Sequence, residues 1–345
     1  MKVAIIGCGK VARGHIRAWQ GHPEAEIAML VDVAEELAYE TREECEMDPQ
    51  LPISTDYREA LARADIDIVD ICTPSHLHAE QIIAALQAGK HIVTEKPTGY
   101  TLEECRLLRY HRMCHPEPKV AVAYSLRYYP VNVAAHRLVS EGAIGEVFAG
   151  QFTWNHPMHG ERPEEGIARR RATGYGTLSD LGGRYIPGSE AAGPTHVFDL
   201  ARYFMGDPEE VFACRRRYGI TAVATFPGGG ACTMVAGVSP QHGSRNPTVM
   251  VLQGTEGTIH TVMNQQGQYT GTIADAHGER PIEAGSDTGH GDRTRTENVL
   301  GAILRDEPLI CPLEEGISTS EFLHAIWDSY NLGIRVPVHT AGKTG

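Results

Sequence analysis

The stretch that decides the fold is Lys2-Val3-Ala4-Ile5-Ile6-Gly7-Cys8-Gly9-Lys10-Val11-Ala12, near the amino end of the 345-residue chain. Its first half is a continuous apolar run, typical of a strand buried on both faces of a parallel sheet. A G-x-G-x-x-A pattern follows and opens a predicted helix over residues 11–19. In such a unit the two glycines allow a tight turn and close approach of a pyrophosphate, and the small third residue lets the helix pack on the strand. The pattern predicts a dinucleotide site at Gly7, Cys8, Gly9, Lys10, Val11 and Ala12.

The second predicted strand ends at Asp32, 20 residues after Ala12. An acidic side chain at this place accepts hydrogen bonds from the adenosine ribose of NAD, and its charge repels the 2′-phosphate of NADP. The following Val33-Ala34-Glu35 offers no Arg to hold that phosphate. We therefore expect NAD rather than NADP, although Asp32 is also suited to cap the next helix.

The first 123 residues alternate strand-like and helix-like patterns, which predicts a doubly wound parallel sheet of the Rossmann type. The expected strands are 2–6, 26–32, 67–72, 91–94 and 119–123, and the expected helices are 11–19, 34–45, 57–64, 76–87 and 101–115. After residue 124, one helix over 130–141 precedes strands in series, as in an antiparallel or mixed sheet. These strands are expected at 146–154, 210–217, 219–226, 231–238, 248–253 and 258–263, with late helices near 293–305 and 313–330 covering one face. The fold class is thus α/β, with a nucleotide-binding domain over 1–123 and an α+β domain over 124–345.

Composition narrows the function classes. Apolar residues make up 41% and charged residues 22% of the chain, as in ordinary globular proteins. The formal net charge of −13 disfavours nucleic acid and anionic membranes as partners. No apolar run approaches a membrane span, and the amino end lacks the features of a secretory signal. The eight Cys form no Cys-x-x-Cys pair, so we expect reduced thiols in a cytoplasmic protein. The 17 His form no zinc signature, and we predict no metal.

Several further motifs point to a known family. The chain contains Cys72-Thr73-Pro74-Ser75-His76-Leu77-His78, Glu95-Lys96-Pro97, Gly142-Ala143-Ile144-Gly145 and Gly254-Thr255-Glu256-Gly257. Together with the glycine turn, they resemble the glucose-fructose oxidoreductase, inositol dehydrogenase and rhizopine catabolism family, Gfo/Idh/MocA. The resemblance implies a second domain with a large open, mostly antiparallel sheet, often used to form homodimers or homotetramers. It also implies oxidation or reduction of a secondary alcohol on a sugar, inositol or related cyclic polyol, with Thr73, Pro74 and His78 lining the cofactor cleft.

Lys96 is the candidate proton acceptor. It follows a predicted strand at a carboxyl end, where open α/β sheets bind ligands. Pro97 restricts it to an extended geometry, and burial or the charge of oxidised nicotinamide would lower its pKa. Glu95 is expected to orient the neighbouring backbone or the nicotinamide ribose. The alternative is a surface Lys paired with Glu95.

The resemblance also concerns a segment that would face the substrate. In relatives an Asp-x-Gly-x-His-x-x-Asp pattern starts a helix, but here Arg184 stands at the His position after Asp180. The simplest alignment inserts Arg184 to Thr195, so that Asp180 and His196 keep the family roles beside Lys96. Alternatively Arg184 replaces the family His, and His196 only begins a helix. Further residues are expected to border the cleft: Arg127 beside the cofactor, and Tyr128, Trp154, His156 and Tyr175 beside the substrate.

Three functions remain open at this point. The first is an NAD-dependent dehydrogenase acting on a sugar or cyclic polyol. The second is a glycoside hydrolase that uses NAD for transient oxidation followed by elimination. The third is a nucleotide-binding sensor without turnover, against which the proton-transfer groups Lys96, Asp180 and His196 argue.

Overall fold

The computed structural model describes residues 1–157, 195–216, 219–239, 248–264, 268–285 and 291–340. The chain divides into two compact units. The first comprises Met1–Tyr128 and Gly289–Ser320, and the second comprises Tyr129–Thr288 and Glu321–Gly345. The sequence prediction of one carboxy-terminal domain over 124–345 differs from this division, because a late segment returns to the first unit.

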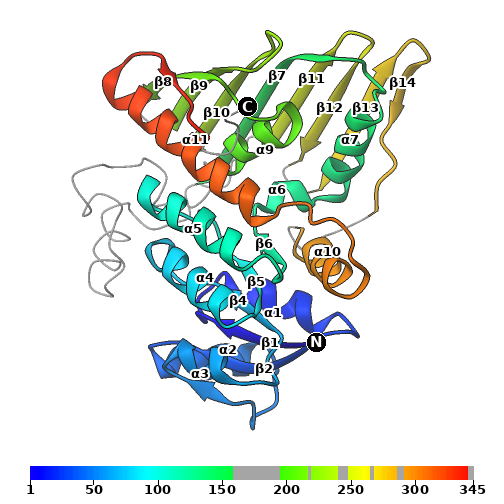
Figure 1. Ribbon diagram of the computed structural model, residues 1–345. Helices are drawn as coiled ribbons and strands as arrows, with labels where there is room; N and C mark the ends of the chain where they lie inside the picture. Colours follow the sequence, from blue (N-terminus) through cyan, green and yellow to red (C-terminus); the bar gives the residue numbers. More distant parts are fainter. Residues whose placement is uncertain (158–194, 217–218, 240–247, 265–267, 286–290, 341–345) are drawn as a thin grey trace. The chain divides into compact units, whose positions relative to one another are not determined.

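The first unit contains a six-stranded parallel sheet in the order β3-β2-β1-β4-β5-β6 (Figure 1). Its strands are β1 (Lys2–Ile6), β2 (Glu26–Val31), β3 (Ile53–Ser54), β4 (Ile68–Ile71), β5 (His91–Thr94) and β6 (Val120–Val122). The doubly wound prediction is confirmed. Only the two-residue β3 was missed, because it is too short to show a periodicity.

Alternate side chains of each strand point to opposite faces of this sheet. Both faces carry apolar side chains, and helices pack on both. Val3 and Ile5 of β1 lie in one apolar cluster, and Ala4 and Ile6 lie in the other. The helices of this unit are α1 (Ala12–Gln20), α2 (Glu35–Glu44), α3 (Tyr57–Ala62), η1 (Ser75–Leu77), α4 (His78–Gln87), α5 (Leu102–Cys114), α6 (Ser125–Tyr128) and α10 (Asp292–Arg305). α11 (Leu313–Leu332) begins in this unit and ends in the second.

The placement of α10 corrects the expectation that it covers the second sheet. Val299 and Leu300 of α10 are buried with Ile16 and Trp19 of α1 in the core of the first unit. The apolar stripe of a helix shows that it packs on something, but its partner is decided by tertiary contacts. The first unit therefore combines the amino-terminal residues with the late segment Gly289–Ser320.

The second unit is built on a nine-stranded sheet, ordered β14-β13-β12-β11-β7-β10-β9-β8-β15. β7 and β10 pair in parallel, and every other neighbouring pair is antiparallel, which confirms the mostly antiparallel prediction. The strands are β7 (Val147–Pro157), β8 (Glu210–Arg216), β9 (Gly219–Thr225), β10 (Ala231–Ser239), β11 (Thr248–Gly254), β12 (Gly257–Met263), β13 (Tyr269–Asp275), β14 (Gly278–Pro281) and β15 (Val336–Pro337). Sequence patterns missed the last three.

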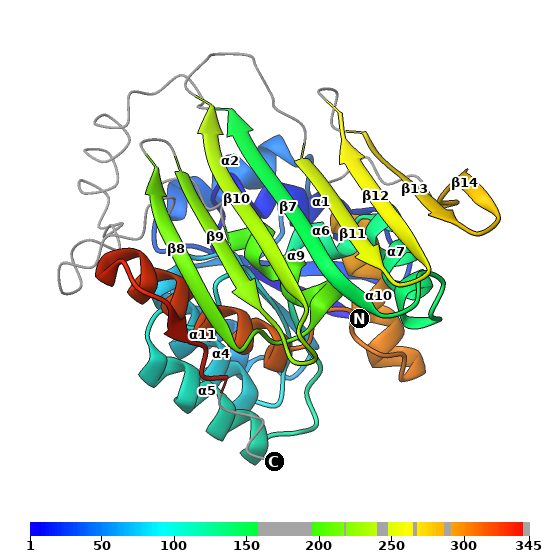
Figure 2. The same cartoon turned by 90° about the horizontal axis from the view of Figure 1, so that it is seen from above.

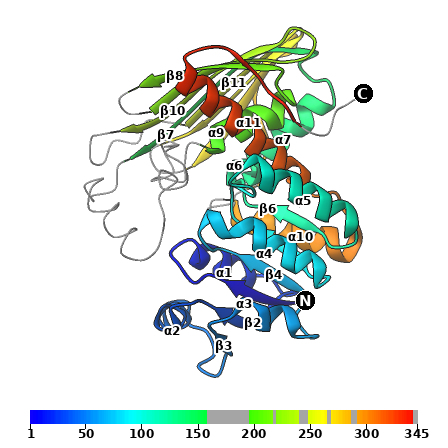
Figure 3. The same cartoon turned by 60° about the vertical axis from the view of Figure 1, so that its left-hand side comes forward.

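Helices lie on one face of this sheet (Figures 2 and 3). They are α7 (Pro130–Ser140), α9 (Thr195–Met205) and the later part of α11. Ser329 of α11 accepts a hydrogen bond from the backbone N–H of Ala213 in β8, at 2.9 Å. Among the described residues, no helix is long and apolar enough to span a membrane.

Candidate active site

The glycine turn lies at the carboxyl end of β1, beside the end of β4. Gly7 has a φ of +92°, and a Cβ there would lie 2.8 Å from the carbonyl carbon of Cys72 and from the amide nitrogen of Thr73. A Cβ at Gly9 would meet no heavy atom of the described residues within 4 Å. The first glycine is therefore required by backbone conformation and packing. The second leaves open space along the backbone, as a bound pyrophosphate needs.

The first turn of α1 fits an anion. Ala12, where the helix begins, is buried, and the cap residue Val11 makes no side-chain hydrogen bond to that turn. No acidic residue stands in the turn, and Lys10 is exposed just before it. A helix start without a side-chain cap offers N–H donors and a positive partial charge to a phosphate. These residues fit the pyrophosphate of a dinucleotide.

Asp32 lies directly after β2 and next to the glycine turn. Its Oδ2 accepts a hydrogen bond from the Cys8 N–H at 2.7 Å, and its Oδ1 accepts one from the Ala34 N–H at 2.9 Å. These bonds orient the carboxylate, and each oxygen retains capacity for a further donor such as a ribose hydroxyl. The Cys8 thiol lies in the core, where burial raises its pKa to about 12. Cys8 therefore acts in this turn through its backbone.

His78 connects two turns at the edge of the sheet. Its Nδ1 lies 2.8 Å from the carbonyl oxygen of Pro97, and its Nε2 lies 2.7 Å from that of Thr73. Burial lowers the pKa of His78, and the two carbonyl contacts oppose this effect. Pro74 stands between these groups as the cap of η1. One buried side chain thus holds the turn after β4 against the turn that carries Lys96.

Lys96 lies two residues beyond β5 and is buried, with 8% of its surface exposed. Its backbone N–H donates to Oε2 of Glu95 at 3.2 Å, and its Nζ lies 4.0 Å from the same oxygen. Burial lowers the pKa of Lys96, and the charge of Glu95 opposes that shift. Of the alternative, a surface Lys paired with Glu95, the surface position is wrong because Lys96 is buried, whereas its amine does lie near the Glu95 carboxylate.

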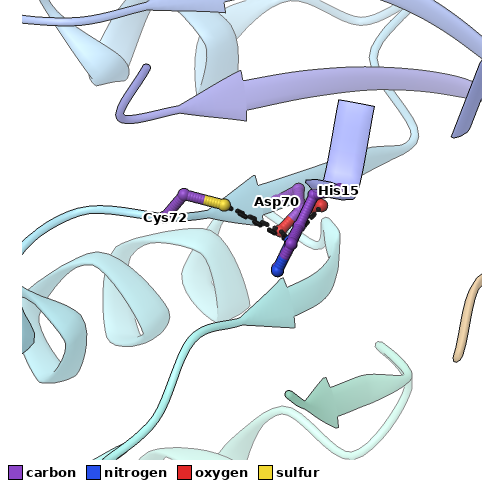
Figure 4. Close-up of side chains that lie close together, drawn as sticks. All are labelled: His15, Asp70 and Cys72. Atoms are coloured by element: carbon purple, nitrogen blue, oxygen red, sulfur yellow. Dashed lines mark hydrogen bonds and ion pairs between the residues drawn. The ribbon is translucent and has the colours of Figure 1, made fainter. Parts of the chain in front are cut away.

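A cluster of polar side chains lies within the first unit, and Figure 4 shows three of its members, His15, Asp70 and Cys72. His15 of α1 contacts both carboxylate oxygens of Asp70 through Nδ1, at 2.9 and 3.0 Å. Trp19 donates its Nε1–H to Oδ2 of Asp70 at 2.7 Å. The Nε2 of His15 lies 3.2 Å from Oε1 of Glu95. The cluster therefore joins the cofactor helix α1 to the residue before Lys96.

The same cluster has the composition of a metal-ligand set. Ligand atoms of His15, Asp70 and Cys72 all lie within 4.8 Å of one another. They already contact each other directly, however, since Cys72 Sγ lies 3.3 Å from His15 Nδ1. Desolvation raises the pKa of the Cys72 thiol to about 12, which disfavours the thiolate that binds metals. A hydrogen-bonded cluster explains the geometry.

Arg127 and Tyr128 lie in α6 and are both buried. Arg127 pairs with Oε2 of Glu315 at 3.1 Å, and the Tyr128 hydroxyl donates to the carbonyl oxygen of Val122 at 3.2 Å. These contacts tie α6 to α11 and to β6 within the first unit.

The second unit brings two predicted substrate residues together. The rings of Trp154, in β7, and His196, at the start of α9, have centroids 6.4 Å apart. His156 lies two residues after Trp154 on the same strand. Tyr175, Asp180 and the proposed insertion up to residue 194 lie outside the described residues.

Two family models match this chain. One, described as an oxidoreductase family with an NAD-binding Rossmann fold, covers residues 1–112. The other, the C-terminal domain of the Gfo/Idh/MocA proteins, covers residues 132–260. The chain belongs to the Gfo/Idh/MocA oxidoreductase family. It is an enzyme with NAD as its cofactor, and the glycine turn of the first unit fits that cofactor.

Two dehydrogenases are similar in sequence to this chain over more than half of its length. Levoglucosan dehydrogenase of Pseudarthrobacter phenanthrenivorans is 28% identical over 339 residues, covering 83% of this chain and 80% of the relative. Inositol 2-dehydrogenase of Rhizobium meliloti is 27% identical over 209 residues, covering 60% of this chain and 56% of the relative. A solved structure of levoglucosan dehydrogenase with NADH and L-sorbose has a TM-score of 0.84 at 23% identity, and 99% of each chain is covered. That likeness shows the same fold.

Sequence reasoning missed the charged cluster around His15. Two signals were present. His15 falls in the buried stripe of α1, between Ala12 and Trp19, and Asp70 interrupts the apolar strand Ile68–Ile71. A buried polar residue in each of two adjacent apolar elements indicates that they are partners.

Proposed function

We propose that this enzyme transfers hydride between a secondary alcohol of a sugar, inositol or related cyclic polyol and NAD, with Lys96 exchanging the hydroxyl proton. The relatives support the substrate class, because they are named for levoglucosan and inositol. When bound, NAD supplies the hydride acceptor of the oxidation. The chain must supply a base for the hydroxyl proton, since alcohol oxidation releases both.

The observation that carries the proposal is the burial of the Lys96 amine. An exposed Lys keeps its proton at neutral pH, whereas desolvation favours the neutral amine that accepts a proton. Burial lowers the pKa of Lys96 in this way. Lys96 also follows the carboxyl end of β5, at the same edge of the sheet as the glycine turn after β1. Ligands of open α/β sheets bind at this edge.

Replacing Lys96 by Met tests the role. Loss of a positioned acid–base group should lower kcat by roughly 10²–10⁴-fold while NAD still binds. NADH formation is followed by near-ultraviolet absorbance on a panel of inositols, aldoses, anhydrosugars and glycosides. Glycoside cleavage without accumulation of NADH would instead favour the hydrolase.

Lys90 provides the matched control. Lys90 lies just before β5, whereas Lys96 lies just after this strand. Both side chains are buried to the same degree, with 8% of the residue exposed. Its amine donates to the carbonyl oxygens of Arg63 and Ile66 at 2.7 and 2.8 Å. Lys90→Met should therefore lower the melting temperature but keep the turnover of the folded enzyme. Turnover lost equally in both variants, or in neither, would contradict the role of Lys96.

Substrate binding in the second unit is proposed for Trp154 and His196, with Asp180. An aromatic face beside a hydrogen-bonding ring suits a polyhydroxylated ring, and the first two side chains lie together. Asp180 enters the proposal through the sequence resemblance.

We further propose that a second copy of the chain covers the open face of the nine-stranded sheet. Figure 2 shows that no helix of the described residues lies in front of this face. Phe212, Val223 and Val235 are 39%, 41% and 36% exposed, respectively, whereas their strand neighbours Ala222 and Ala224 are buried on the helix side. Exposed apolar side chains on adjacent strands are typical of subunit contacts. Light scattering on Val223→Glu should show smaller particles than the wild type; an unchanged mass would contradict the proposal.

A further inference from the structure

A line of charged side chains runs through the interior of the first unit from α1 to Lys96. His15 Nδ1 lies 2.9 Å from Oδ1 of Asp70, and its Nε2 lies 3.2 Å from Oε1 of Glu95. The other oxygen of Glu95, Oε2, lies 4.0 Å from Nζ of Lys96. The two oxygens of one carboxylate thus face two different nitrogen groups.

This geometry requires a proton on both ring nitrogens of His15. An ionised carboxylate only accepts hydrogen bonds, so a ring held between Asp70 and Glu95 must donate from each nitrogen, and only the imidazolium can do so. Burial and the charge of Arg295 oppose this protonation, but the charge and the hydrogen bond of Asp70 hold the pKa of His15 well above its ordinary value. Burial likewise opposes ionisation of Glu95, but the hydrogen bond from His15 and the charge of Lys96 lower its pKa.

Other titratable groups of the described residues lie beside this line of side chains. Arg295 of α10 is paired with Asp292 at 2.7 Å. Burial opposes ionisation of Asp70, but the charge and hydrogen bond of His15, the charge of Arg295 and the hydrogen bond of Trp19 together lower its pKa. The Cys72 thiol, 3.3 Å from Nδ1, stays neutral because desolvation raises its pKa to about 12. On the side of Lys96, the ring of His78 contacts the carbonyl oxygens of Pro97 and Thr73, and burial lowers its pKa against these two contacts.

We propose that His15 is a positioning residue for Lys96, a buried cation that holds and partly neutralises the Glu95 carboxylate so that Lys96 can release its proton. The inference rests on the proton-transfer role proposed for Lys96. A carboxylate beside an ammonium favours the charged form, so Glu95 alone would make Lys96 hold its proton. The imidazolium on the far side of the same carboxylate weakens that effect. It also fixes the orientation in which Glu95 accepts the Lys96 backbone N–H, at 3.2 Å.

The test measures the titration of Lys96 directly. Competitive labelling with a trace of acetic anhydride, read by peptide mass spectrometry over a pH series, reports the pKa of a single amine without any substrate. It is carried out on the full chain, with and without saturating NAD. His15→Gln removes the positive charge and should raise the Lys96 midpoint by about one pH unit. Glu95→Gln removes the anion and should lower it by a similar amount.

Cys72→Ala is the matched control, because it removes a neutral group in contact with the same ring. Its Lys96 midpoint should equal that of the wild type. A disturbance of packing would move the midpoint in all three variants in the same direction, whereas the proposal requires opposite shifts for His15→Gln and Glu95→Gln. An unchanged midpoint in folded His15→Gln would overturn it.

A measurement on the wild-type protein keeps the proposal testable if His15→Gln does not fold. Nitrogen NMR of histidine-labelled protein should show both ring nitrogens of His15 protonated at pH values well above 6.5, the ordinary pKa of histidine. A neutral ring there would refute the inference. A different result would refute the proposed function of Lys96. In that case Lys96→Met would keep its turnover, whether or not His15 is protonated.

Discussion

Alanine substitutions at the two glycines of the cofactor turn should have different effects: Gly7→Ala should lower the stability of the protein, and Gly9→Ala should lower its affinity for NAD. Gly7 has a φ of +92°, and an added Cβ would lie 2.8 Å from three backbone atoms of Cys72 and Thr73. At Gly9 the added Cβ would meet no atom of the described chain within 4 Å. Gly7→Ala therefore perturbs the protein itself, and Gly9→Ala perturbs the space reserved for the pyrophosphate.

The size of each effect follows from this geometry. A left-handed φ costs an L-residue about 1–2 kcal/mol, and overpacking against fixed backbone costs about 1–3 kcal/mol more. Gly7→Ala should thus lose roughly 2–5 kcal/mol of unfolding free energy, or roughly 4–20 °C in melting temperature for a unit of this size. Gly9→Ala should change stability by less than about 1 kcal/mol but weaken NAD binding roughly tenfold or more, which is about 1.4 kcal/mol.

Thermal melts of the NAD-free variants measure the first effect, and titration calorimetry with NAD measures the second. The wild type and Lys90→Met serve as references for stability. Equal destabilisation by both glycine variants would refute the reasoning, since only Gly7 combines a left-handed φ with a Cβ position that meets backbone atoms. So would a Gly9→Ala variant that binds NAD as tightly as the wild type.

Three further predictions concern the cofactor, the substrate and pH. Asp32→Ala should weaken NAD binding by about 1.5–3 kcal/mol, the value of hydrogen bonds to a charged group. It should also reduce the preference of the enzyme for NAD over NADP. An unchanged ratio of the NAD and NADP dissociation constants would refute the proposal that Asp32 binds the adenosine ribose. His196→Ala should lower kcat by roughly 10²-fold or more, while calorimetry should show an unchanged affinity for NAD. An unchanged turnover would contradict a role of His196 in the active site. The pKa of buried His15 is raised and that of Asp70 is lowered. The contribution of His15 to the free energy of unfolding is therefore fully present below its unfolded-state pKa near 6.5, and it is lost as pH rises through its folded-state pKa. The contribution of Asp70 is lost as pH falls through the folded-state pKa of Asp70. Melting temperatures of wild type and His15→Gln should converge toward alkaline pH, and a constant difference would contradict this linkage.

The sequence by itself determined the local structure and the residues of the cofactor turn. The strand, turn and helix from Lys2 to Gln20 follow from a continuous apolar run, two glycines and a helical stripe within one short stretch. Asp32 was predicted by its spacing from Ala12, and its carboxylate accepts a hydrogen bond from the glycine turn. Such signals are local, because they report backbone conformation and the buried face of one element. The strands that arrive in series also predicted an antiparallel or mixed second sheet, and the family resemblance implied that this sheet is mostly antiparallel.

Only the tertiary structure decided which elements meet. Nothing in the apolar pattern of α10 shows that it packs on α1 rather than on the second sheet. His15 is 55 residues from Asp70 and 80 from Glu95, and the pattern around each residue alone does not show which residue it contacts. Their contact arises because β4 and β5 are neighbours in the sheet and α1 packs across them. A buried ion pair is a property of two or more elements at once, so periodicity within one element does not reveal it.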